Sequence, residues 1–281
     1  MTGGVGRPGG GAPAGILAAV LLALAWAAAP GGLRDVLRER ALDALHGPAP
    51  ATPDIVVVDI DRAAIARFGD WPWGRARLAE LLGAVAAAGP AAIGLDILLA
   101  GPDRFSPAAL ARQLGEATGR ADLAALAAAL PDGDARLAEV LRATPVALGF
   151  VLESRPLPDD PPGVPVLVEG APHLPGLWTA PGLQGPPPTL AAAAAGLGLL
   201  ALDADADGRI RRVPLLALVG DAARPGLAVE ALRLAEGAGA LVIAADPPRL
   251  AIGGVEVPLD GSAMLRLRPG DPARWAARTV S

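Results

Sequence analysis

Two short apolar runs separated by helix-patterned sequence constrain the fold of this chain most. The runs cover residues 55–58 and 91–98. Neither alternates apolar with polar residues, which is typical of strands buried on both faces of a parallel sheet. Between them, apolar residues recur at helical spacing over 75–88. This order predicts a strand–helix–helix–strand unit at the start of the domain.

The rest of the sequence predicts further helices, a third buried strand, two hairpins and a last strand. The helices are 107–130 with a break near Gly119, 134–142, 190–195 and 225–236; the strands are 146–152 and 263–268; the hairpins join 197–202 to 209–219 and flank Gly253-Gly254. The predicted fold class is therefore α/β, with a mixed, largely parallel central sheet that is covered by helices and carries added β-hairpins. The proline-rich segment 154–188 receives no predicted place.

Carboxylates follow the first run and lie near the end of the second. Asp59 and Asp61 follow residues 55–58, and Asp96 lies within 91–98. Open α/β sheets bind ligands at the carboxyl ends of adjacent strands, and clustered carboxylates there suit Mg²⁺ or Ca²⁺. The alternative is that Asp61 caps the next helix while the others accept hydrogen bonds from loop amides.

A tryptophan-rich loop precedes the second predicted helix. Trp71 and Trp73 flank Pro72, and Arg75 follows. The two indoles form either an aromatic wall for a ligand or a cover for the core beside Phe68. Arg75 either binds a ligand or caps and pairs locally.

Four segments resemble the type 2 CHASE domain, a sensory domain associated with cyclases and histidine kinases. They are 55–61, 71–75, 93–96 and the Asp-Gly-Arg-Ile-Arg-Arg-Val-Pro part of 205–214. The resemblance covers most of residues 50–281. It implies an extracytoplasmic domain that binds a signal and is not an enzyme. The receptor would be a bacterial transmembrane protein of the adenylate or diguanylate cyclase or histidine or serine/threonine kinase type. The candidate ligand-binding residues are then Asp59, Asp61, Trp71, Trp73, Arg75 and Asp96.

Composition divides the chain into four parts. Residues 1–13 are rich in Gly and Pro and are expected to be disordered. Residues 14–45 are predicted to form a membrane anchor and helical stalk, and 46–53 a proline-rich linker. The resemblance implies that residues 54–281 form the extracytoplasmic sensor domain.

The N-terminal segment has two interpretations. A bilayer span needs roughly 20 apolar residues, and residues 8–33 carry no charge. A cleaved signal peptide ending at 27–29 competes with an uncleaved anchor that inserts 14–33 into the lipid bilayer. The anchor is favoured because a helical apolar stripe continues over 33–45. More arginines follow this segment than precede it, which favours a cytoplasmic domain. The resemblance implies the opposite side, and we expect the main domain outside the cytoplasm.

Composition also excludes several classes of protein. A net charge of -5 argues against a nucleic-acid partner. The absence of cysteine excludes disulfides and thiolate metal sites. His46 and His173 have no partner pattern, and no nucleophile or phosphate-loop motif occurs, so neither a cofactor nor a metal is expected.

One segment partly matches a calcium-binding loop. Asp203, Asp205 and Asp207 precede Gly208 at the required spacing, but Pro214 occupies the position of the bidentate glutamate. A hairpin turn capped by its own aspartates is the better interpretation.

Two other functions remain open from sequence. One is an exported hydrolase whose metal is held by Asp59, Asp61 and Asp96, and the other is a soluble periplasmic binding module. Family members typically continue beyond this point, so we expect an incomplete C-terminus without the output domain. An open sheet edge with unpaired N–H and C=O groups would favour a homodimer. The signal itself, a small molecule or a protein, stays unspecified.

Overall fold

A computed structural model gives the structure of the chain. It describes residues 11–47, 49, 54–157, 161, 163–268, 270, 273, 276 and 278–281. The chain divides into two compact units. The smaller contains Met1–Thr52, Ala204–Arg211 and Arg268–Ala276, and the larger contains Pro53–Asp203, Arg212–Leu267 and Ala277–Ser281. Residues 1–10 of the predicted disordered segment and most of the predicted linker 46–53 lie outside the described residues.

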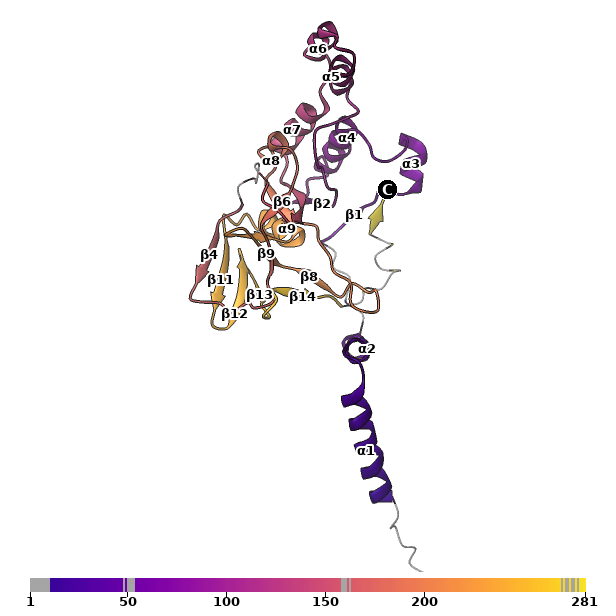
Figure 1. The fold of residues 1–281 in the computed structure, drawn as a ribbon. Coiled ribbons are helices and arrows are strands. Elements are labelled where there is room, and N and C mark those ends of the chain that lie inside the picture. The colour runs from indigo at the N-terminus through magenta and orange to yellow at the C-terminus, as the bar shows by residue number, and fades with distance from the viewer. Residues whose placement is uncertain are drawn as a thin grey trace, which may run out of the picture. The chain divides into compact units, whose positions relative to one another are not determined.

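A parallel sheet lies at the centre of the larger unit (Figure 1). β3 (Val146–Glu153) pairs in parallel with β2 (Ile93–Leu95) and with β7 (Gly196–Leu199). β6 (Gly182–Gln184) pairs antiparallel with the end of β3. The predicted α/β class and the buried strand over 146–152 are confirmed.

One face of this sheet is lined by small residues. Gly94 and Gly198 lie on the strands that flank Ala147 of β3. A Cβ on Gly198 would overlap the Cα of Leu227, which begins helix α9 (Leu227–Ala235). The absence of side chains therefore lets α9 lie directly on the strands.

The opposite face carries the large apolar side chains, because side chains alternate along a strand. Helices α4 (Arg75–Ala86) and α7 (Gly133–Ala143) contact each other and belong to the core on this face. That core includes Leu78, Leu82, Leu95, Leu137, Leu141, Leu148 and Phe150. Helices thus cover both faces of the sheet, as the order of elements predicts.

A second sheet packs on a second hydrophobic core. Its strands are β13 (Val255–Pro258), β12 (Pro248–Ile252), β11 (Leu241–Ala245) and β4 (Val166–Glu169), in that order. Leu215, Leu216, Val229, Leu241, Ile243, Leu250 and Ile252 form its core. Gly253 has φ +57° in the turn between β12 and β13, so the predicted hairpin around Gly253-Gly254 is confirmed.

The strand pairing corrects two predictions. Further elements of the larger unit are β5 (Trp178–Ala180), α8 (Pro188–Ala191), β8 (Arg212–Pro214), β9 (Leu216–Val219), β10 (Ala222–Pro225) and β14 (Met264–Arg266). The hairpin between 197–202 and 209–219 is wrong, because β7 pairs with β3 and β8 pairs with β14. The single, largely parallel sheet is also wrong, since the described strands form several separate sheets and many pairs are antiparallel. Three strands, β4 to β6, lie in the proline-rich segment.

Two short helices form a helical hairpin (Figure 1). Ser106 caps α5 (Pro107–Thr118), and its side chain accepts a hydrogen bond from the N–H of Ala109. Gly119 ends α5 with φ +66°, and α6 (Ala121–Ala127) follows. The predicted break near Gly119 is confirmed.

The first apolar run differs most from its prediction. Only β1 (Val57–Val58) is a strand, and it pairs in parallel with β15 (Thr279–Val280) instead of lying beside β2. Residues 55–58 are exposed. An apolar β-branched run indicates a strand, but it does not specify the neighbour, which depends on residues distant in the sequence.

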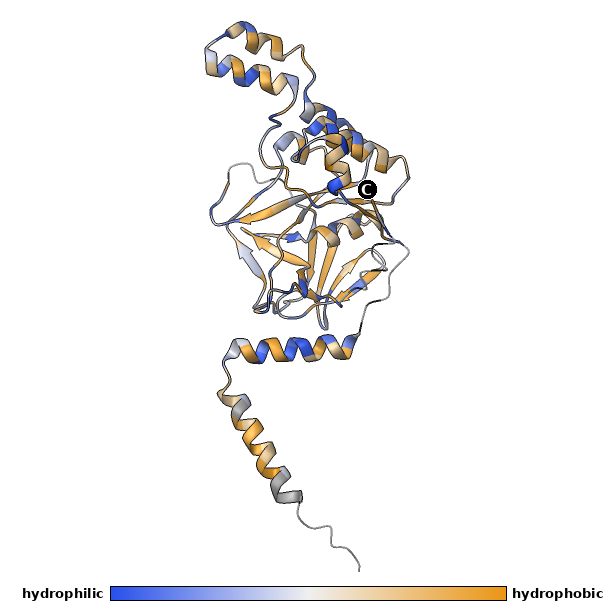
Figure 2. Cartoon of the chain, turned by 90° about the vertical axis from the view of Figure 1, so that its right-hand side faces the viewer, coloured by the Kyte–Doolittle hydropathy of each residue, from blue (hydrophilic) through white to orange (hydrophobic). Residues whose placement is uncertain are grey.

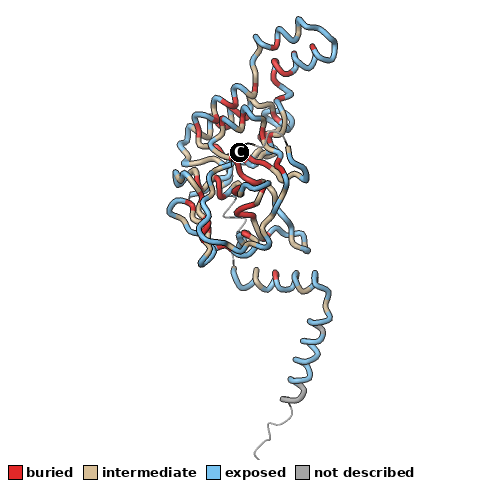
Figure 3. Tube along the Cα trace, turned by 60° about the vertical axis from the view of Figure 1, so that its left-hand side comes forward, coloured by how far each residue is buried: buried red, intermediate tan, exposed pale blue. Residues whose placement is uncertain are grey.

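The smaller unit contains α1 (Gly11–Ala28) and α2 (Gly31–His46). A helix covers the predicted stretch 33–45, but its expected continuity with the apolar segment is wrong, since Pro30 lacks an N–H and lies between α1 and α2. In the described part of the chain, no single helix is long and apolar enough to cross a bilayer. The helix pair 15–28 and 31–46 reaches the required length and apolar composition only when taken together, and the two helices are bent by 117° relative to each other. The described side chains of α1 are apolar and exposed (Figures 2 and 3).

Candidate functional site

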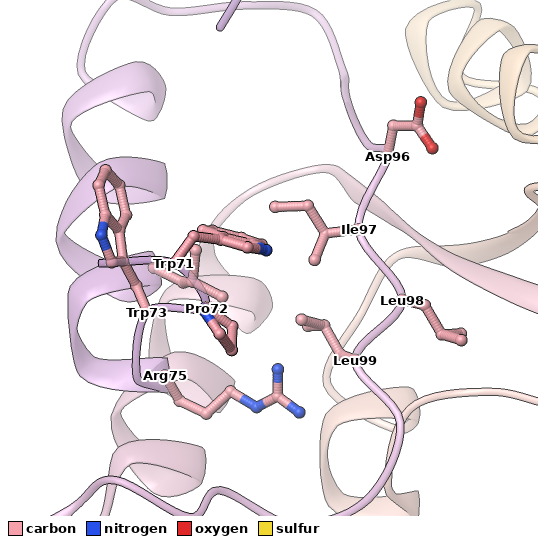
Figure 4. Close-up of a pocket in the computed structure, with 9 residues that line it drawn as sticks. Trp71, Pro72, Trp73, Arg75, Asp96, Ile97, Leu98 and Leu99 are labelled. Atoms are coloured by element: carbon pink, nitrogen blue, oxygen red, sulfur yellow. The ribbon is translucent and has the colours of Figure 1, made fainter. Parts of the chain in front are cut away.

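A cavity of about 330 Å³ brings four of the six candidate residues together. The lining residues are Trp71, Pro72, Trp73, Arg75, Leu78, Asp96, Ile97, Leu98 and Leu99. They come from the loop before α4, the first turns of α4 and the segment after β2. In Figure 4, Trp71 lies between Trp73 and the segment 96–99.

The tryptophan loop is held by one hydrogen bond and by ring contacts. The Nε1–H of Trp73 donates to the carbonyl oxygen of Gly69 over 2.8 Å. The Trp73 ring lies edge-on to Phe68 and Trp71, with centroid distances of 5.8 and 5.9 Å. Trp73 is 9% exposed and Trp71 41% exposed. Trp73 is therefore part of the hydrophobic core, and Trp71 provides the accessible aromatic surface of the cavity.

The positive charge of Arg75 is already matched within the protein. Its Nη2–H donates to the carbonyl oxygen of Gly101 over 3.1 Å, and its Nε lies 3.4 Å from Oδ1 of Asp134. The other oxygen of Asp134 accepts a 2.9 Å hydrogen bond from the N–H of Asp103. Asp103 is buried, and its Oδ2 has no hydrogen-bond partner among the described residues. The surroundings of Arg75 therefore carry more negative than positive charge.

Asp96 is the exposed acid of the cavity. Its carboxylate points away from Arg75 in Figure 4 and makes no hydrogen bond or ion pair with another described residue. The cavity thus combines an aromatic and aliphatic wall with one available carboxylate and one neutralised cation.

Asp59 and Asp61 lie elsewhere. Asp61 caps α3 (Arg62–Phe68), accepting a 2.8 Å hydrogen bond from the N–H of Ala64, and it also accepts one from Oγ of Ser281. These two hydrogen bonds lower the pKa of the Asp61 carboxyl. Asp59 is exposed, and its N–H donates to the carbonyl oxygen of Val280. The capping interpretation of Asp61 is confirmed.

The proposed convergence of three carboxylates is wrong. β1 and β2 are not neighbours, so Asp59 and Asp61 do not share a sheet edge with Asp96. Within the described ranges, no group of three His, Asp or Glu side chains is placed to hold a metal ion. The hypothesis of a hydrolase whose metal is held jointly by Asp59, Asp61 and Asp96 is therefore not supported by the structure.

The partial calcium loop is also a structural turn. Gly208 has φ +77°, its N–H donates to the carbonyl oxygen of Asp205, and the Asp207 carboxylate accepts from the N–H of Arg209. The self-capped turn is confirmed, although no hairpin surrounds it. Arg211 binds the carboxylates of Asp205 and Asp207 in this turn.

Sequence reasoning missed some residues that shape the cavity. Asp103 and Asp134 carry no motif, and they reach Arg75 only because the loop before α5 and the start of α7 meet there. Ile97 to Leu99 were partly assigned to a strand that ends at Leu95. The local signals that were available are the helix-capping residues Ser106 and Asp132, which mark the starts of α5 and α7 and therefore the ends of the loops before them.

The larger unit is a mixed α/β domain with a cavity lined by aromatic and aliphatic side chains. The family model for the CHASE2 domain matches residues 16–281, and the chain belongs to the CHASE2 domain family. CHASE2 domains are extracellular sensory domains of signalling receptors and are not catalytic. Comparisons with curated proteins and with solved structures found no match.

Proposed function

We propose that this chain is the ligand-sensing input domain of a transmembrane receptor of the cyclase or kinase type, and that the signal binds in the cavity beside Trp71. The observation that carries the proposal is that two segments, 71–75 and 96–99, meet around one cavity. Its volume lies at the lower end of the range of about 300–1,000 Å³ typical of small-molecule sites.

The charges around the cavity favour one class of ligand. The guanidinium of Arg75 is already paired with Asp134, which accepts from the N–H of Asp103, and Asp96 adds an exposed carboxylate to the cavity wall. An anionic ligand would meet net negative charge, whereas a cation benefits from the Asp96 carboxylate and from the Trp71 ring. We therefore expect a small ligand with an apolar body and a positive charge or none.

Binding is tested by titrating the purified chain with probes of opposite charge. Alkyl- and arylamines form one series and the matching carboxylic acids the other, with calorimetry and tryptophan fluorescence as readouts. The amines should bind, and Trp71→Leu and Asp96→Asn should each weaken binding about tenfold or more. Asp221→Asn, an exposed acid remote in sequence, is the control. Preferred binding of the acids, or equal effects of all three variants, contradicts the proposal.

Membrane attachment through residues 14–33 and an extracytoplasmic main domain are further parts of the proposal. The segment 14–33 carries no charge and reaches the length of about 20 residues needed to cross a bilayer, and the described side chains of α1 are exposed and apolar, which supports insertion. A reporter that is active only outside the cytoplasm, fused after Ser281, should be active, and the chain should sediment with membranes. Recovery in the soluble fraction with a new N-terminus near Pro30 would instead support a released binding module.

A further inference from the structure

A buried arginine in the smaller unit binds three carboxylates at once. Arg211 is 4% exposed. Its Nε–H donates to Asp43 over 2.9 Å, one Nη donates to Asp205 over 2.9 Å and to Asp207 over 2.8 Å, and the other Nη donates to Asp207 over 2.9 Å. The planar guanidinium fork suits the bidentate bond to Asp207 and leaves Nε for Asp43. We name this set, Arg211 with Asp43, Asp205 and Asp207, the Arg211 clamp.

The members of the clamp come from two separate segments of the chain. Asp43 lies in the last turn of α2, the helix that follows the proposed membrane segment. The other three members lie in the loop 204–211, which follows β7 and leads directly into β8. The turn at Gly208 returns the chain so that Arg211 reaches back to Asp207, four residues earlier.

Arg211 is the residue that holds the Arg211 clamp together. Among the described contacts, the guanidinium of Arg211 is the group that meets all three carboxylates. Arg209 adds little, since its Nη1 lies 3.9 Å from Asp43 on a side chain that is 68% exposed. Without the guanidinium of Arg211, Asp43 would lose its hydrogen-bonded link to Asp205 and Asp207. The contact of α2 with the loop 204–211 through Asp43 therefore depends on Arg211.

We propose that the Arg211 clamp ties the membrane-proximal helix α2 to the loop between β7 and β8, so that α2 follows movements of these two strands. The clamp would then carry a change in the sensor domain toward the membrane. This inference uses the proposed placement of the chain in a membrane receptor, but its contacts are independent of the cavity and of any ligand.

The clamp is tested by amide hydrogen exchange on the full chain in detergent. Arg211→Gln and Asp43→Asn should each speed exchange in residues 31–46 by about tenfold or more, because a charge-assisted hydrogen-bond network is lost. The double variant should match Arg211→Gln alone, since both remove the same interaction. Exchange in β3 should stay unchanged. Arg209→Gln is the matched control and should have little effect.

A urea series tests the coupling itself. In the unsubstituted chain, exchange in α2 should accelerate at the urea concentration where tryptophan fluorescence reports loss of the larger unit. In Arg211→Gln, α2 should exchange fast without urea while the fluorescence midpoint is unchanged. Unaltered α2 exchange in Arg211→Gln, equal effects of Arg209→Gln, or joint acceleration of α2 and β3 overturns the proposal. A failure of ligand binding in the cavity would leave these outcomes unaffected.

Discussion

Glu230 accepts two hydrogen bonds from Arg233, three residues later on α9, at 2.7 and 2.9 Å. Glu230 is fully buried. Arg233 also donates to the carbonyl oxygens of Ala238 and Ala195, so the pair joins the end of α9 to the residue before β7. The ion pair is therefore part of the contact through which α9 lies on the small-residue face of the sheet.

Replacing Glu230 by alanine should lower the free energy of unfolding by about 3–5 kcal/mol, because Arg233 would stay buried without its partner. Urea unfolding followed by circular dichroism measures the change. Glu256→Ala is the matched control: Glu256 pairs with Arg249 on the surface, and its loss should cost less than about 1 kcal/mol. Equal costs would show that the buried pair has no special role.

Substituting Gly196 by alanine should destabilise the larger unit by at least about 3 kcal/mol or prevent folding, because the new Cβ would overlap Oε1 of the buried Glu230. Gly83→Ala on α4 is the opposite case. No atom lies within 4 Å of its added Cβ, and alanine in a helix should raise stability by about 0.4–1 kcal/mol. The two unfolding curves should move in opposite directions; a neutral Gly196→Ala would contradict the close approach of α9 to β7.

The elements that sequence predicted well are those defined by local signals. The break at Gly119 follows from a residue that tolerates positive φ, and the hairpin at Gly253-Gly254 follows from turn chemistry. Helices α4 and α7 follow from apolar periodicity. Each of these depends on residues within one or two turns of chain.

The pairing of strands was not available from the sequence in the same way. β1 pairs with β15, more than two hundred residues away, and β8 pairs with β14 instead of β7. The candidate site shows the same division. The loop 71–75 and Asp96 were identified locally, whereas Asp103 and Asp134 reach Arg75 only through tertiary packing. A local pattern states that a strand or a charge is present, and the long-range contact decides its partner.

Trp73→Phe should cost about 1 kcal/mol or somewhat more, because the indole N–H that donates to Gly69 is lost while most of the ring contacts remain. Trp73→Ala should cost about 3–5 kcal/mol as a large cavity forms. Trp71→Phe, at the exposed indole, should change stability by less than about 0.5 kcal/mol. Thermal and urea unfolding of the three variants check the order; a larger cost at Trp71 than at Trp73 would reverse the roles assigned to the two rings.

The Arg211 clamp should hold from pH 8 to pH 5 and open in acid. Hydrogen bonds from Arg211 hold the pKa of the Asp207 carboxyl well below its ordinary value, and the pKa of Arg211 itself is raised.

The sign follows from Asp207, whose folded pKa lies below its unfolded value of about 3.9. Its contribution to stability is therefore complete above that value and is lost as the pH falls through the folded pKa. Among the described residues, Arg209 also acts on the Asp207 carboxyl, and Asp43 and Asp205 share its partner Arg211.

The measurement uses a nitroxide label on a cysteine introduced by Leu45→Cys on α2. The chain contains no other cysteine, and the native Leu45 side chain is 82% exposed. Label mobility should be constant between pH 8 and 5 and should rise only below about pH 4, the ordinary carboxyl range. In Arg211→Gln the label should be mobile at every pH, and in Arg209→Gln it should behave as in the unsubstituted chain. A mobility change centred between pH 5 and 7 would place control of α2 in a different group, because hydrogen bonds from Arg211 hold the pKa of the Asp207 carboxyl below its ordinary value and so below that range.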